Sequence, residues 1–267
     1  MLAPDQDCGV LVVPAVPVLA AGTPAVLKIV VPSIDDEWTD EPMGNVFLVR
    51  HGQASFGAED YDALSPLGVS QSEQLGRWLA AGGMTPWRVC SGAMKRHRQT
   101  AMSCLTHWNL PGMAVQEDPR FDEFDFRDIL AVSQPDLGDW SRVRQLIATE
   151  AGKGFQGKFS AALRQWIGAP DDAGYRESWP AFKRRCLAAL EDVGSASEQG
   201  DVWVFTSGGP IAVMVQGLLE ISDRHVLDLN KVVRNGAVTQ VIWRGGRGLL
   251  AQFNAVGHLA PGDLSFR

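Results

Sequence analysis

Three short stretches of the sequence place polar side chains directly after an apolar run. The first is residues 50–53, RHGQ, which follow the run Asn45–Val49. The second leads from Ser91 to Arg96, and the third is residues 207–209, SGG. Where such a stretch joins a strand to a helix, the N-terminus of the helix offers unpaired N–H groups and the positive end of a dipole. Both favour an anion, so these residues indicate phosphate chemistry.

The combination of one histidine with two arginines narrows that chemistry further. A neutral imidazole such as that of His51 can attack phosphorus if its other ring nitrogen donates to a fixed acceptor. Nearby guanidinium groups, here Arg50 and Arg96, disfavour the protonated ring and keep it nucleophilic. Each guanidinium can also donate two parallel hydrogen bonds to two oxygens of one phosphate, which a lysine cannot do.

The elements that must position these residues alternate between strands and helices. Strands are predicted over residues 45–49, 87–90, 201–206, 237–243 and 249–253. Helices are predicted from Ser65-Pro66, after Ser91-Gly92 as far as Thr106, and after Gly209 as far as Leu219. This alternation predicts an α/β three-layer sandwich, with a mostly parallel sheet, helices on both faces and the polar stretches at one edge. Residues 125–194 carry only helical patches and are expected to form a helical insertion over the active site.

Bulk properties limit the function classes. The chain has 267 residues and a formal net charge of -7, which argues against nucleic acid and anionic membranes as partners. Its four cysteines are scattered, so we expect free thiols, no metal site and a cytoplasmic location. Residues 1–44 are expected to be a non-catalytic extension and linker before a domain over 45–267. Prolines interrupt the apolar part of the extension, which argues against a membrane anchor.

Five ordered blocks of the sequence resemble the histidine phosphatase (phosphoglycerate mutase-like, branch 1) superfamily. They are similar to its LxRHGx, LTxxGxxQA, SxxxRxxQTA, LxE and VxHGGxI motifs. The blocks are residues 47–53, 64–71, 91–101, 121–123 and 205–211, and Asn254 and His258-Leu259 echo a further C-terminal motif.

The resemblance implies a role for each matching residue. His51 would become the phosphohistidine, with Arg50 and Arg96 as the phosphate clamp. Glu123 would protonate the leaving alkoxide and then activate water, although it could also belong to an ordinary acidic loop. Gln53 would touch phosphate or merely cap a turn. No metal or other cofactor is implied.

The roles expected for other residues in or near these motifs are less specific. Ser207 and Gly208 would complete the phosphate site. His97 and His107 follow Arg96 on the predicted helix, and structural roles are expected for both.

Ser207 is also the one departure from the family pattern. The family has a second histidine at this position, and losing one preorganised contact costs about 10²–10³ in rate. Either Ser207 and the following amides replace the imidazole, another cation such as Arg234 or Arg244 is recruited, or turnover is lost. The weaker positive field also disfavours a mutase, which must preserve its phosphoenzyme.

The sequence therefore predicts a phosphomonoester hydrolase that acts on a small phosphorylated metabolite. The alternative is an attenuated or inactive protein that binds a phosphorylated ligand. A homodimer is a further option, and the sequence does not choose among the substrate classes.

Overall fold

The computed structural model describes residues 43–55, 60–137, 139, 141, 143 and 153–266. The predicted N-terminal extension lies outside the described residues, apart from Met43 and Gly44, which belong to the first strand. The described strands are β1 (Met43–Arg50), β2 (Arg88–Ser91), β3 (Val115–Glu117), β4 (Val202–Thr206), β5 (Val238–Arg244) and β6 (Arg247–Ala255). They form one sheet in the order β3-β2-β4-β1-β5-β6.

The sheet is mostly parallel, which confirms the predicted fold class. Strands β3, β2, β4 and β1 are parallel neighbours, whereas β5 pairs antiparallel with both β1 and β6. The last two strands were predicted, but β3 was not. It is only three residues long and two of its side chains are exposed, so it carries no apolar run.

The described helices are α1 (Pro66–Ala81), α2 (Lys95–His107), α3 (Phe126–Ser133), α5 (Lys153–Ile167), α6 (Trp179–Ser197), α7 (Gly208–Leu218) and α8 (Val226–Val232). Helices α1, α2 and α7 lie close to their predicted limits, whereas α3 and α8 were not predicted. Short 3-10 turns are η1 (Pro119–Phe121), η2 (Pro135–Leu137), η3 (Asp223–His225) and η4 (Pro261–Asp263). Helix α1 starts as predicted, because the Ser65 hydroxyl accepts a hydrogen bond from Gly68 N (3.1 Å) and Pro66 occupies the first turn. None of the described helices is long and apolar enough to cross a bilayer.

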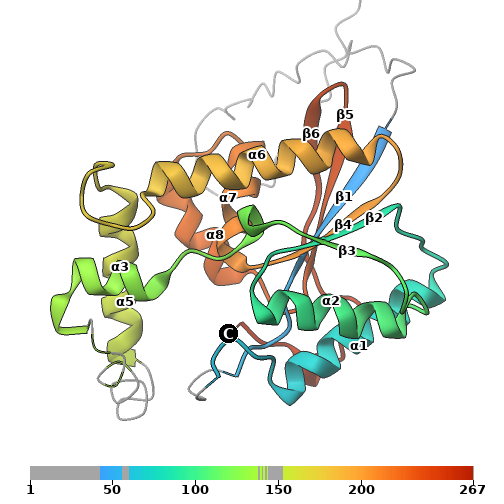
Figure 1. The fold of residues 1–267 in the computed structure, drawn as a ribbon, viewed down its shortest axis with the longest axis horizontal. Helices are drawn as coiled ribbons and strands as arrows, with labels where there is room; N and C mark the ends of the chain where they lie inside the picture. The colour runs from blue at the N-terminus through green and yellow to red at the C-terminus, as the bar shows by residue number, and fades with distance from the viewer. Residues whose placement is uncertain are drawn as a thin grey trace, which may run out of the picture. The chain divides into compact units, whose positions relative to one another are not determined.

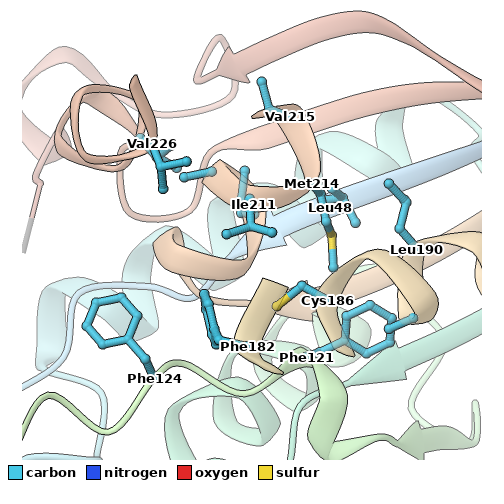
Figure 2. Packing of buried hydrophobic residues seen from close by; sticks show 14 of the residues in the cluster. Leu48, Phe121, Phe124, Phe182, Cys186, Leu190, Ile211, Met214, Val215 and Val226 are labelled. Carbon is cyan, nitrogen blue, oxygen red and sulfur yellow. The ribbon is translucent and has the colours of Figure 1, made fainter. Parts of the chain in front are cut away.

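Strand β1 is buried on both faces and thereby divides the core in two. Val46 and Leu48 pack into the cluster that includes α6 and α7, whereas Phe47 and Val49 pack with α1 and α2. This alternation follows from the two-residue period of a strand. Figure 1 shows the resulting layers, with α1 and α2 on one side of the sheet and α6 and α7 on the other. Figure 2 shows the first cluster, in which Leu48 lies among side chains of the covering helices.

The described residues between β3 and β4 form helices and no strand, and they supply one helix that covers the sheet and a pair of helices beside it. Helix α6 packs against β1 and α7, whereas α3 packs against α5 beside the sheet (Figure 1). The ring of Phe126, at the start of α3, lies edge-on to Tyr61 with a centroid distance of 5.6 Å. Tyr61 in turn lies under the guanidinium of Arg96. The beginning of α3 is therefore close to the end of the sheet where the polar stretches were predicted.

Two glycines allow the loop after β1 to rest on the first turn of α1. A Cβ atom on Gly68 would lie 2.1 Å from Gln53 O, and one on Gly52 would lie 2.2 Å from Gly68 O. We expect Gly68→Ala to lower the free energy of unfolding by about 3 kcal/mol, because rigid backbone must move apart. Urea denaturation would measure the loss, with Gly112→Ala as a matched control whose Cβ would meet nothing within 4 Å. Equal stability of the two variants would contradict the prediction.

Candidate active site

The three polar stretches meet at one edge of the sheet because their strands are parallel neighbours. Arg50 pairs with Thr206 in the register of β1 and β4, and Ser91 pairs with Phe205 across β2 and β4. The backbone continues this pairing beyond the strands, since His51 N donates to Thr206 O at 2.8 Å. The residues that follow β1, β2 and β4 therefore converge, as open α/β sheets require for ligand binding.

His51 is held as a neutral ring with one nitrogen available. The side chain is buried, and its Nδ1 lies 2.7 Å from Gly52 O. A carbonyl oxygen can only accept, so Nδ1 carries the proton and Nε2 keeps its lone pair. Burial lowers the pKa of His51 well below its ordinary value, and the charges of Arg96 and Arg50 lower it further. The ring therefore has the protonation state that an attack on phosphorus needs.

Arg50 lies along the N-terminus of α7 with part of its guanidinium unpaired. Its Nη1 donates to Val233 O and, at 3.3 Å, to Phe266 O. Its Nε is buried and has no hydrogen-bond partner among the described residues. Burial lowers its pKa to about 10. A Cβ atom on Gly208 would lie 3.4 Å from this Nε, an ordinary contact, but only 2.4 Å from Asn230 Oδ1, so the glycine gives room to that amide.

Arg96, at the start of α2, reaches the same edge and has a similar orphaned donor. Its Nη1 donates to Asp62 Oδ1 at 2.7 Å, and its Nη2 donates to Ser207 Oγ at 3.4 Å. Its Nε is also buried without a partner in the described part of the chain. Burying a charged donor without an acceptor is costly, so two such groups beside one neutral imidazole indicate a site built for an anion.

Glu123, in the loop between η1 and α3, lies at the N-terminus of α7. Its Oε2 accepts from Gly209 N at 3.2 Å, and its Oε1 accepts from Phe124 N at 3.3 Å. Burial raises the pKa of Glu123, although the charges of Arg96 and Arg50 oppose the shift. The pKa values of Glu123 and His51 thus move in opposite directions, which is typical of an acid and a nucleophile that share one site.

Gln53 has a structural contact in this site. Its Oε1 accepts from Ser65 Oγ at 2.8 Å, and its backbone N–H donates to Gln71 Oε1 at 2.8 Å. The side-chain oxygen is therefore committed to the first turn of α1. The contact between Gln53 and phosphate stays a prediction. Only the side-chain nitrogen, Nε2, could make it, because the backbone N–H and Oε1 already have partners.

Ser207 precedes α7, is completely buried and has an unexpected partner. His97 Nε2 lies 2.6 Å from Ser207 Oγ. The ring of His97 is also buried, and its centroid lies 5.7 Å from that of His51. His97 was expected to have only a structural role. The structure instead places its ring inside the candidate site, beside Ser207 and His51.

Of the two cations considered as replacements, Arg244 lies away from the site, whereas Arg234 follows Val233, whose carbonyl oxygen accepts from Arg50. Arg244 pairs with Met43 at the opposite end of β1, so recruiting it to the site is ruled out by strand geometry. The guanidinium of Arg234 lies over the ring of Phe266 at 5.1 Å. Sequence reasoning also missed Asp62, which anchors Arg96, and Asn235, whose Nδ2 donates to His51 O at 3.3 Å.

Comparison with known proteins agrees with this geometry. A sequence profile of the histidine phosphatase superfamily (branch 1) matches residues 46–256, which is well over half of the chain. The chain belongs to this superfamily. Its members include phosphatases and mutases.

Solved structures of this histidine phosphatase fold match most of the chain. A Bacillus stearothermophilus YhfR structure is 20% identical, with a TM-score of 0.59, and the match covers 80% of this chain and 98% of that one. Bacillus anthracis phosphoglycerate mutase is 18% identical (TM-score 0.57, 82% and 96% covered). Entamoeba histolytica phosphoserine phosphatase in complex with 3-phosphoglyceric acid is 21% identical (TM-score 0.55, 81% and 99% covered). At these identities the likeness establishes the fold alone.

Proposed function

We propose that this histidine phosphatase superfamily member hydrolyses phosphomonoesters through a phosphohistidine on His51. The observation that carries the proposal is a pair of buried Nε groups, of Arg50 and Arg96, that have no partner among the described residues and lie beside a neutral imidazole. Bound phosphate oxygens would supply the missing acceptors of both guanidinium groups. The same anion would lie at the N-terminus of α7, where the helix dipole adds to the positive field.

The reaction would proceed in two displacements. In the first, His51 Nε2 forms a bond to phosphorus, the bond to the leaving oxygen breaks, and Glu123 gives its proton to that oxygen. In the second, Glu123 takes a proton from water as the water oxygen attacks phosphorus, and the N–P bond breaks. Arg50 and Arg96 hold the three non-bridging oxygens throughout and stabilise the charge that develops on them.

A small phosphorylated metabolite is the proposed substrate class, and hydrolysis is favoured over phosphoryl isomerisation. Structural neighbours carry the names of a phosphoserine phosphatase and a putative α-ribazole-5'-phosphate phosphatase, and both names refer to small phosphate esters. A mutase must protect its phosphohistidine from water while the bound intermediate reorients in the site. A serine at position 207 adds no charge to support that longer-lived state. The cytoplasmic location and the homodimer stay predictions.

A phosphoenzyme trap tests this proposal. Wild-type protein mixed with an aryl phosphate at mildly acidic pH should release phosphate and, when quenched in base during turnover, carry one phosphoryl group on His51 that acid removes. Peptide mass spectrometry would locate the group. Binding of inorganic phosphate without turnover or phosphoenzyme would instead support the alternative of a phospho-ligand binding protein.

A further inference from the structure

His97 and Ser207 form a buried pair that the proposed mechanism does not yet use. They come from different elements, α2 and the β4–α7 junction, and are 110 positions apart in the chain. Both side chains are fully buried, and the distance of 2.6 Å between Nε2 and Oγ is that of a short hydrogen bond. Arg96 Nη2 approaches the same hydroxyl oxygen at 3.4 Å.

The surroundings of His97 are shaped to hold its ring in this place. A Cβ atom on Gly92 would lie 2.2 Å from His97 Nδ1 and 2.6 Å from Asp122 Oδ1, so only glycine leaves space for both groups. Asp122 Oδ1 lies 3.5 Å from Nδ1 and accepts a hydrogen bond from Met94 N at 3.2 Å. Nδ1 itself has no hydrogen-bond partner among the described residues, although a carboxylate faces it.

The contacts of Ser207 decide where its single proton can point. If both ring nitrogens of His97 carry a proton when the anion is bound, Nδ1–H faces Asp122 while Nε2–H donates to Oγ together with Nη2–H of Arg96. The hydroxyl proton of Ser207 then has no acceptor in this pair and is available to a ligand. Ser207 Oγ lies at the N-terminus of α7, within reach of Arg96 Nη2, and the ring of its partner His97 lies 5.7 Å from the ring of His51. A phosphoryl oxygen held by Arg96 is the acceptor that this arrangement calls for.

We propose that His97 is a positioning residue that acts through Ser207, polarising the serine hydroxyl so that it donates to the phosphoryl group held by Arg96. The inference rests on the proposed phosphatase function. In this arrangement His97, on α2, supplies an imidazole beside position 207, where the resemblance implies a histidine. Asp122 faces the ring on the other side and would stabilise positive charge on it when the anion is bound.

A double-mutant cycle over His97→Ala and Ser207→Ala tests the relay. We expect each single change to lower kcat about 10- to 100-fold and the double change to cost no more than the larger single loss, because both remove the same contact. His97→Gln, whose amide can still donate to Oγ, should recover most of the rate and serves if the alanine variant folds poorly. His107→Ala is the matched control on α2, since its half-buried ring donates to Ser103 O in its own helix and lies 3.9 Å from Glu73 Oε2.

Exchanging the two side chains gives a second arm. Ser207→His alone should be poorly active, because a ring at 207 would compete with His97 for the same space. Combining it with His97→Ala should recover activity to within about tenfold of wild type. Unchanged kcat in His97→Ala with a lower Tm would reduce His97 to a structural role and overturn the inference. Trapping an acid-stable phosphoserine on Ser207 would overturn it too, because His97 would then be activating a nucleophile.

The same cycle in phosphate affinity separates this inference from the proposed function. Inorganic phosphate binding is measured by calorimetry on wild type, both single variants and the double variant. A wild type that binds phosphate without turnover refutes the phosphatase, whereas coupled losses of phosphate affinity would still support the relay. Additive losses, or no phosphate binding by wild type, would refute the relay.

Discussion

His51→Ala should abolish phosphatase turnover, with kcat lower by on the order of 10⁴-fold or more. The substitution removes the only atom proposed to bond to phosphorus, so the reaction loses its covalent route. Arg50 and Arg96 remain, and their unpaired donors should still hold phosphate. We therefore expect phosphate to raise the Tm of the variant nearly as much as that of wild type. Steady-state kinetics with an aryl phosphate and thermal unfolding with and without phosphate measure the two effects.

The control for this experiment is another histidine outside the site, the half-buried His107. His107→Ala should keep the wild-type rate, since His107 bonds to Ser103 O within its own helix. A His51→Ala protein with turnover near that of the control would refute the phosphohistidine mechanism. Loss of phosphate stabilisation together with turnover would show instead that the ring is needed to assemble the site.

Glu123→Gln should lower kcat by about 10²–10⁴-fold for an alkyl phosphate, with little change in KM. An alkoxide leaves poorly without a proton, and Glu123 is the proposed donor. A nitrophenolate needs no proton to leave, so the loss should be much smaller for nitrophenyl phosphate. This difference between leaving groups is the direct measurement of the role. The exposed Glu117→Gln serves as a matched control, and equal losses for the two substrates would contradict proton donation by Glu123.

The pH profile should change with the same substitution. Because burial raises the pKa of Glu123, its acid form persists above the ordinary range of a glutamate, and activity should fall as pH rises through that raised value. Because the pKa of His51 is lowered, the neutral nucleophile persists below the ordinary range of a histidine. Wild type should therefore show an acidic optimum. In Glu123→Gln the basic limb should disappear, while the acidic limb set by His51 remains.

The sequence predicted the sheet and most helices because each had a local signal. Ser65 and Pro66 marked the start of α1, and apolar runs marked β1 and β4. Strand β3 had no such signal, since it is held in place by its backbone pairing with β2 rather than by an apolar pattern. A local sequence pattern predicts a helix or strand only where the buried side chains that stabilise it recur at a regular spacing within that segment.

The same limit explains what was missed in the site. Arg50 ends a strand, and His51 and Ser207 stand directly after strands, so the topology alone predicts that they meet. His97 stands one position after Arg96 on a helix, and its meaning depends on Ser207 and on the space beside Gly92. Asp62 lies in a loop, and only the fold brings it to Arg96. Contacts between distant elements leave no periodic trace in the sequence.

The central place of β1 has a consequence for biosynthesis. Val46 pairs with Val202 on one side and with Val241 on the other, so the strand that leads to His51 has no lasting partner until most of the chain has left the ribosome. Such long-range pairing is slow, and an unpaired apolar strand is prone to aggregation. We expect nascent chains that stop before β4 to associate with chaperones, and recovery of soluble protein to improve at lower expression temperature.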